Sequence, residues 1–165
     1  MIVLGIDPGT ANTGYGVVEG GRPGNPRALA EGVIETAAGA PAERRLAQIH
    51  AEVAELLDRH QPAAIALEDV YFGQNARSAF AVGQARGVVL LAAGQRGIPC
   101  ASYTPQQVKG AVCGSGRAAK PQVGAMVARL LSLATVPASD HAADALAVAL
   151  CHANRGPLER ALART

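Results

Sequence analysis

Aromatic residues and cysteines are scarce in this sequence of 165 residues. There is no tryptophan, and only three tyrosines and two phenylalanines are present, so any stacking on a ring must fall on very few positions. The three cysteines, Cys100, Cys113 and Cys151, are odd in number and form no C-x-x-C pair. This pattern indicates neither a disulfide framework nor a zinc site, and it is typical of a protein of the cytoplasm, where thiols stay reduced.

Long hydrophobic runs are also lacking. No apolar stretch approaches the roughly 20 residues that a membrane span needs, and residues 1–4 lead straight into a strand-like segment without a basic leader or a cleavage site. We therefore expect neither export nor membrane insertion. Because 49% of the residues are hydrophobic, the chain can bury a core, and we expect one domain over residues 1–155 followed by a flexible tail over 156–165.

Acidic residues are missing from one long segment. None lies between Asp69 and Asp140, while the same segment carries the cations Arg77, Arg86, Arg96, Lys109, Arg117, Lys120 and Arg129. The net charge of +2 indicates no partner by itself, but this uneven distribution favours a polyanion. The alternative is that these cations are scattered over a solvated surface, where such side chains are mostly found.

The first third of the chain is rich in strand signals. Residues 2–6 form a short apolar run that ends at the turn signal Asp7-Pro8-Gly9. Two further strands are expected over 14–18 and 28–36, with a Gly- and Pro-rich loop between them. These strands predict an antiparallel meander, and the helical spacing of apolar residues over 41–60 predicts an amphipathic helix after it.

Strands and helices then alternate. Strands are expected over 63–67 and 98–103. The helix expected between them, over 75–96, is apolar around nearly its whole circumference, so one sheet face cannot cover it and a partner subunit is a candidate for the rest. A meander followed by alternating strands and helices predicts a mixed α/β sheet with helices on its faces.

The last third is predicted to be helical. Thr104-Pro105-Gln106-Gln107 has the pattern of a capping box that begins a helix. Two more helices are expected over 121–133 and 140–154, and Ser139 is the candidate N-cap of the second.

Three carboxylates occur in or directly after apolar elements. Asp7 ends the first strand and Glu68 ends the fourth, so a parallel arrangement would place both at the edge where ligands gather. Asp144 lies in a helix that is apolar enough to be buried. Clustered carboxylates repel one another unless cations neutralise them, and hard oxygen ligands favour two Mg²⁺ ions, with Mn²⁺ as a substitute, for phosphodiester cleavage. For Asp7 alone, the alternative is an ordinary turn residue.

Histidines are few, and one of them lies near this cluster in the sequence. His141 precedes Asp144 by three residues and shares its helix face. Seen singly, the two would be interpreted as a helix-start histidine and a locally satisfied aspartate. The other histidines, His50, His60 and His152, are interpreted as helix-surface residues.

Two more features suit nucleic acid. Tyr71 and Phe72 directly follow Glu68 and Asp69, where a ring could stack on an unpaired base, or could close the edge of the core instead. The Gly-rich basic segment 109–120 could follow a phosphate backbone, although it does not match a nucleotide-binding loop.

Several short motifs are spread along the chain. They are Gly5-Ile6-Asp7-Pro8-Gly9 with Thr13-Gly14-Tyr15-Gly16, Ala66-Leu67-Glu68-Asp69-Val70-Tyr71, Gly83-Gln84-Ala85-Arg86-Gly87, Gln107-Val108-Lys109, Lys120-Pro121-Gln122-Val123 and His141-Ala142-Ala143-Asp144-Ala145-Leu146-Ala147. In this order, and from Met1 to about His152, they resemble the RuvC family of bacterial Holliday junction resolvases.

The resemblance implies a fold and an activity. The implied fold is ribonuclease H-like, with a mixed five-stranded sheet flanked by helices. The implied activity is a pair of magnesium-dependent nicks, made by a homodimer and placed symmetrically across a four-way DNA junction. The branch-migration helicase complex of RuvA and RuvB is the implied partner.

The resemblance also carries roles onto individual residues. Asp7, Glu68 and Asp144 look like metal ligands of the catalytic site. His141 stands where many relatives have another aspartate, so it is a further catalytic and metal candidate, with Asp140 beside it as the alternative. The residues that look like the DNA contacts of the family are the stacking aromatic Tyr71 and the cations Arg77, Lys109 and Lys120.

Two other classes of protein remain open at this point. Gly-Ile-Asp-x-Gly-Thr also opens actin-like and sugar-kinase-like ATPases that bind phosphate, but those close two domains over a nucleotide and 165 residues supply one. A non-catalytic junction-binding module would keep the basic segment and would not need carboxylates in buried elements.

Overall fold

A mixed sheet of five strands forms the centre of the molecule. The computed structural model describes the chain over residues 1–20, 25–69 and 76–162. The strands are β1 (Ile2–Asp7), β2 (Asn12–Glu19), β3 (Arg27–Glu35), β4 (Ala64–Glu68) and β5 (Cys100–Tyr103). The first three form the expected antiparallel meander, while β4 pairs in parallel with β1 and β5 in parallel with β4. The strand order is β3-β2-β1-β4-β5, which confirms the predicted mixed sheet.

The helices of the described residues are α1 (Ala42–His60), α2 (Ala76–Gly94), α3 (Pro105–Cys113), α4 (Lys120–Leu130) and α5 (Asp140–Leu162). The capping box that begins α3 is confirmed, since Thr104 Oγ1 accepts from the Gln107 amide at 3.2 Å and Gln107 Oε1 accepts from the Thr104 amide at 2.9 Å. None of these helices is long and apolar enough to cross a membrane.

The last helix is longer than predicted. It was expected to end near Asn154, with a tail from residue 156, but α5 continues to Leu162. Pro157 removes one backbone donor from the helix. The residues that follow it, Leu158 and Glu159, nevertheless favour helix, so the helix continues past the proline. The single domain over 1–155 and a flexible end to the chain stay predictions.

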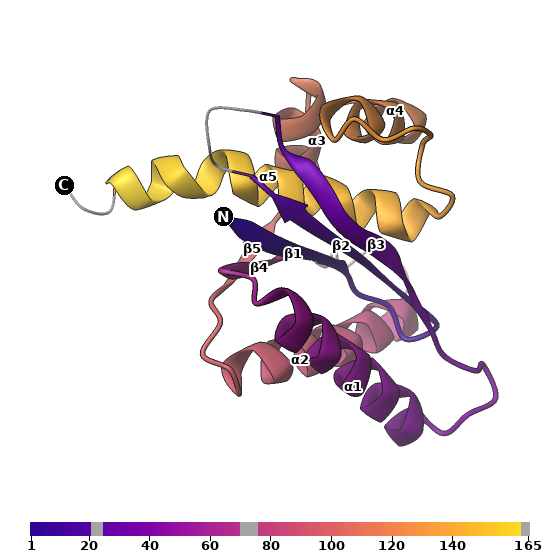
Figure 1. Cartoon of the computed structure of the whole chain (residues 1–165). Coiled ribbons are helices and arrows are strands. Elements are labelled where there is room, and N and C mark those ends of the chain that lie inside the picture. Colours follow the sequence, from indigo (N-terminus) through magenta and orange to yellow (C-terminus); the bar gives the residue numbers. More distant parts are fainter. Residues whose placement is uncertain (21–24, 70–75, 163–165) are drawn as a thin grey trace.

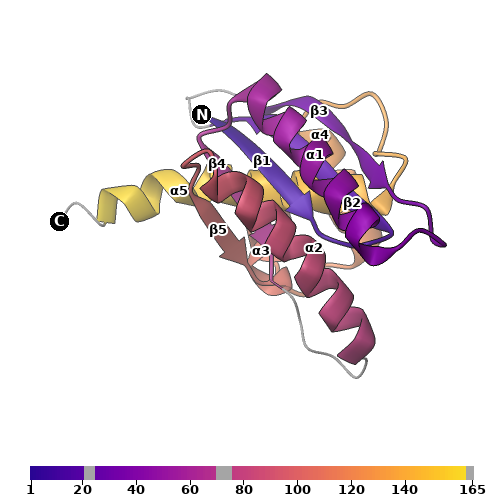
Figure 2. The same ribbon diagram turned by 90° about the horizontal axis from the view of Figure 1, so that it is seen from below.

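Helices cover both faces of the sheet (Figure 1). α1 and α2 pack together on one face, and α5 lies on the other with α3 and α4 against it; Figure 2 shows the α1–α2 side. Neighbouring residues of β1 serve opposite cores, with Val3 on the α5 side and Leu4 on the α1–α2 side. Because α5 lies between the sheet and two helices, its sequence is apolar almost all round.

Burial of α5 also corrects one expectation. His152 was expected on a helix surface, but it is buried, and its Nδ1 lies 2.8 Å from the hydroxyl of Tyr103 on β5. This hydrogen bond offsets the free-energy cost of burying the polar ring, which would be high for an imidazole without a partner inside a core.

Glycines in two strands let α5 lie directly on the sheet. A Cβ at Gly5 would lie 2.0 Å from the Ala145 carbonyl oxygen, and a Cβ at Gly14 would lie 2.0 Å from the His141 carbonyl oxygen. Gly14 pairs with Asp7 across the β1–β2 ladder. The beginning of α5 is therefore held against the carboxyl end of β1.

Replacing Gly14 with alanine should lower the stability of the protein. The added methyl group would meet the backbone of α5, which can move only by lifting the whole helix. Overpacking of this kind costs about 1–3 kcal/mol, and thermal unfolding followed by calorimetry would measure it. Gly110→Ala is the control, because a Cβ there would have its nearest neighbour 4.0 Å away; equal Tm values for the two variants would contradict the close approach.

Candidate active site

Asp7 and Glu68 are neighbours at the carboxyl ends of β1 and β4. Ile6 pairs with Leu67 in the parallel ladder, so the next residue along each strand is Asp7 or Glu68. Side chains alternate between faces along a strand, and the residue two positions before each carboxylate packs against α5 or its core. Both carboxylates therefore face the side of the sheet that α5 covers.

The beginning of α5 brings two more predicted residues to this edge. The His141 amide donates to Ser139 Oγ at 3.2 Å, as expected of an N-cap residue. The Nδ1 atom of His141 lies 2.8 Å from Asp7 Oδ2. Asp144, whose side chain is 29% exposed, lies close enough for its charge to act on both Asp7 and Glu68. The structure thus gathers four predicted site residues from three elements.

Burial and repulsion by neighbouring carboxylates favour protons on two of these groups, Asp7 and Glu68. Burial raises the pKa of Glu68 to about 7, and the charges of Asp7 and Asp144 add to the increase. Burial also raises the pKa of Asp7, against the opposing effect of its hydrogen bond with His141. Positive charge nearby therefore favours the ionised forms of Asp7 and Glu68.

Two lysines supply part of that charge. Lys120 Nζ, at the start of α4, lies 3.2 Å from Asp144 Oδ2 and 3.3 Å from Asp140 Oδ2. Lys109, on α3, is close enough to lower the pKa of Glu68. The two lysines, Glu68 and Asp144 line a cavity of about 220 Å³, and the other lining residues are Pro105, Val108, Val123 and Ala147.

Arg86 and Arg96, two further cations of the acid-free segment, also make contacts within the molecule. The Arg86 guanidinium, on α2, donates to the Glu68 carbonyl oxygen at 3.1 Å and to the Ser102 hydroxyl. Arg96 Nε lies 2.7 Å from a carboxylate oxygen of Asp58 on α1. These contacts hold both guanidinium groups against the protein, so a count of charges along the segment does not by itself define a polyanion-binding surface.

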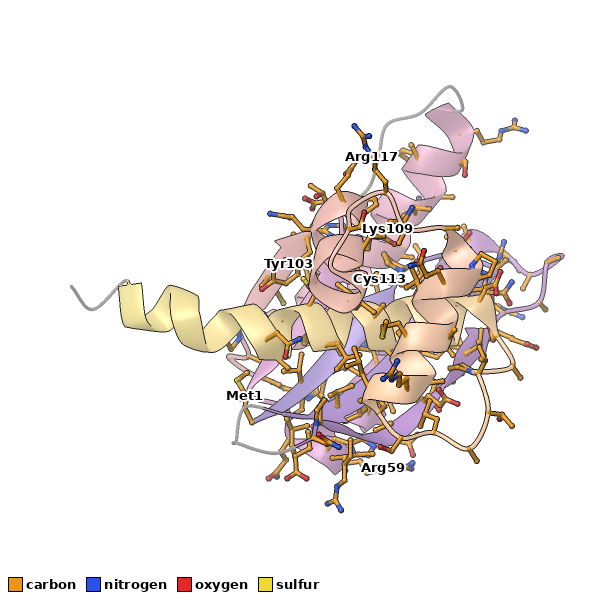
Figure 3. All side chains as sticks on the ribbon, turned by 90° about the horizontal axis from the view of Figure 1, so that it is seen from above. Met1, Arg59, Tyr103, Lys109, Cys113 and Arg117 are labelled. Carbon is orange, nitrogen blue, oxygen red and sulfur yellow. The ribbon has the colours of Figure 1, made fainter. Side chains whose placement is uncertain are left out.

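The remaining predicted DNA contacts differ in how they are placed. Arg77 is exposed in the first turn of α2. Lys109 lies on α3 (Figure 3), and together with Lys120 at the start of α4 it lines the cavity beside Glu68. Tyr71 lies outside the described residues, so its stacking role stays a prediction.

The carboxylates and the imidazole at this edge of the sheet are side chains of the kinds that bind a hard divalent cation. As the side chains stand, no three His, Cys, Asp or Glu side chains of the described ranges are placed to hold one ion, since Lys120 contacts Asp144 and His141 contacts Asp7. Carboxylate oxygens, with one imidazole, are nevertheless the ligands that Mg²⁺ or Mn²⁺ takes. Such an ion would offset both the burial and the repulsion that raise the pKa of Glu68.

Replacing Glu68 with glutamine should stabilise the metal-free protein at alkaline pH. A carboxyl group whose pKa is raised by folding stabilises the fold below its unfolded value of 4.5, and this contribution is lost as the pH rises through about 7. In EDTA at pH 8 we expect a gain of about 1–2 kcal/mol, after allowance for solvent screening of a partly exposed group. The difference should vanish near pH 4.

Thermal melts with and without Mg²⁺ provide the measurement. Added Mg²⁺ should raise the Tm of the parent at pH 8 and leave that of Glu68→Gln nearly unchanged, since ligand binding stabilises only a fold that binds it. Glu31→Gln, an exposed site on β3, is the control. A Glu68→Gln variant that is less stable than the parent at pH 8 would contradict the burial cost.

The strand order, the meander and the carboxylates at the ends of two central strands define a ribonuclease H-like fold with an acidic site. A model of the family described as crossover junction endodeoxyribonuclease RuvC matches residues 3–152. The chain belongs to this family.

Individual relatives agree over almost the full length. The RuvC protein of Pelotomaculum thermopropionicum is 52% identical over 98% of each chain, and that of Thermomicrobium roseum is 56% identical over 92% of each chain. Among solved structures, RuvC of Thermus thermophilus in complex with a Holliday junction substrate is 43% identical, covers 96% of each chain and superposes with a TM-score of 0.92.

Proposed function

We propose that this protein is a Holliday junction resolvase, a magnesium-dependent endonuclease that makes symmetric paired nicks in four-way DNA junctions during recombination and repair. The observation that carries the proposal is the convergence of Asp7, Glu68, His141 and Asp144 at one edge of the sheet, beside a cavity with two lysines. Family membership supports the reaction, and the relative in complex with a junction supports the substrate.

These four residues would hold the metal, with two ions in each site. Such ions supply Lewis acidity at the scissile phosphate and lower the pKa of the attacking water. The protein's own part is to keep the carboxylates ionised and oriented. His141 serves this purpose at Asp7, because its ring nitrogen lies within hydrogen-bond distance of that carboxylate.

The lysines at the cavity would bind the DNA backbone. Lys109 and Lys120 border the same cavity as Glu68 and Asp144, so a phosphate that contacts them also reaches the carboxylates. We also propose Arg77 as a contact to the DNA, and Tyr71 as a ring that stacks on a base near the crossover.

Lys109→Ala should weaken binding to junctions of every sequence. Loss of one phosphate contact flattens the plot of log affinity against log salt by about one unit, and binding in Ca²⁺ at several salt concentrations would measure the slope. Arg129→Ala is the control, because Arg129 is an exposed cation in the last turn of α4 and does not line the cavity. An unchanged slope in Lys109→Ala would remove Lys109 from the DNA contacts.

We also propose that the protein acts as a homodimer through α2. Phe80 and Leu91 are 70% and 55% exposed on this helix, although large apolar side chains are normally buried. Gly83 and Gly87 are exposed between them, and a Cβ at either would touch nothing within 4 Å, so the packing of one chain does not require glycine there. Glycines four residues apart allow two helices to approach closely.

Two further parts of the proposal come from the family resemblance and the sequence. The junction would be delivered by the branch-migration complex of RuvA and RuvB. The protein would act in the cytoplasm, where the cysteines Cys100, Cys113 and Cys151 would stay reduced.

Nicking of a synthetic four-way junction, assayed with Mg²⁺ and with EDTA beside ATP hydrolysis, tests the proposal. We expect symmetric nicks that require the metal and no ATP turnover. ATP hydrolysis without nicking would support an actin-like or sugar-kinase-like ATPase, a reading that the family match over residues 3–152 disfavours. Tight junction binding without nicking in any divalent metal would indicate a non-catalytic binding module.

A further inference from the structure

Lys120 is the cation most closely associated with the acidic cluster. Its ammonium lies 3.2 Å from Asp144 and 3.3 Å from Asp140, and its charge opposes the burial that raises the pKa of Asp7 and of Glu68. The same side chain lines the cavity beside the carboxylates. Lys120 therefore neutralises, from inside the molecule, a carboxylate that a metal ion would also need.

Asp140 differs from the other carboxylates near it. Its side chain is 79% exposed, against 29% for Asp144, and it is the first residue of α5. Because water already solvates such an exposed carboxylate, a metal ion would gain little binding free energy from it. Its contact with Lys120 instead gives that ammonium a partner on the solvent side of the cluster.

We propose that Lys120 is the resident counterion of the acidic cluster and competes with the divalent cation for Asp144, while Asp140 is a positioning residue that retains the ammonium when the cation takes its place. This inference rests on the metal site of the proposed function. Lys120 then has two roles. Before the metal binds, it neutralises Asp144. After the metal binds, Asp140 holds it beside the cavity, where its ammonium can contact a phosphate.

The competition makes opposite predictions for two single variants. Lys120→Met removes the competitor, so Mn²⁺ should bind roughly two- to fivefold more tightly, the scale of one partly exposed ion pair. Asp140→Asn leaves Asp144 as the remaining ion-pair partner of Lys120, so the ammonium is harder for the metal to displace. Mn²⁺ should therefore bind roughly two- to fivefold more weakly, again the scale of one partly exposed ion pair. Calorimetric titration of the full chain with Mn²⁺ at low ionic strength measures both without any nuclease activity.

The double variant separates this role from direct ligation. If Asp140 acts only through Lys120, then Lys120→Met with Asp140→Asn should bind Mn²⁺ as tightly as Lys120→Met alone. An equal weakening by Asp140→Asn in both backgrounds would mean that Asp140 binds the metal itself and would overturn the proposal. Unchanged or weaker binding in Lys120→Met would also overturn it, and Lys120→Gln repeats the test with a polar side chain.

Two further measurements, on a control variant and on the parent protein, distinguish a failure of this inference from a failure of the proposed function. Arg129→Met, which removes a cation from the same helix but from outside the cavity, should leave Mn²⁺ affinity unchanged. If the parent binds no Mn²⁺, the metal site and this inference both fail. If the parent binds Mn²⁺ and all variants bind it equally, only the role of Lys120 and Asp140 fails.

Discussion

Glu68→Gln, Asp7→Asn and Asp144→Asn should each abolish cleavage of a four-way junction while leaving its binding intact. Each substitution keeps the shape of the side chain and removes a negative charge that would hold the metal. Loss of a group that stabilises only the transition state lowers the rate by on the order of 10²–10³-fold or more. Binding should persist because the proposed backbone contacts come from lysines on other elements.

Single-turnover cleavage in Mg²⁺ and gel-shift binding in Ca²⁺ would measure the two effects separately. Glu31→Gln is the matched control, since Glu31 is an exposed carboxylate on β3 and should cut at the parental rate. A near-parental rate in any one of the three variants would remove that residue from the ligand set. Loss of binding together with cutting would show instead that the substitution disturbs the fold or the DNA surface.

Much of the site's framework is predictable because its signals are local. An apolar run that ends in Asp7, and another that ends in Glu68, place a carboxylate after each strand. The parallel pairing of those strands then makes the two neighbours. The capping box at Thr104 is equally local, since both of its hydrogen bonds join residues three positions apart.

The contacts that adjust the site are not predictable in this way, because they join side chains that are distant in the sequence. His141 meets Asp7 across 134 positions, and the pairing of Lys120 with Asp144 depends on how α4 packs against α5. One signal was available: glycine inside a strand often marks a close backbone approach, and Gly5 and Gly14 mark the path of α5 over the sheet.

Leu91→Asp should convert the protein to a monomer and remove its paired nicks. In a two-fold symmetric interface each substitution occurs twice, and burying one leucine is worth about 1.5–3 kcal/mol. Two lost leucines therefore raise the dimer Kd by roughly 10²-fold or more, before the cost of placing two carboxylates in an apolar contact. Sedimentation velocity at micromolar concentration should show the mass fall from two chains to one.

The same variant separates chemistry from symmetry. Leu91 lies on α2, whereas the carboxylates lie on β1, β4 and α5, so a monomer should still nick one strand at high concentration. On a supercoiled plasmid with a cruciform, the parent should give linear product and Leu91→Asp nicked circles. Val136→Asp is the control, because Val136 is 51% exposed in a loop away from α2. A parent that sediments as a monomer and still makes linear product would exclude the dimer, and a Leu91→Asp variant that stays dimeric would place the interface elsewhere.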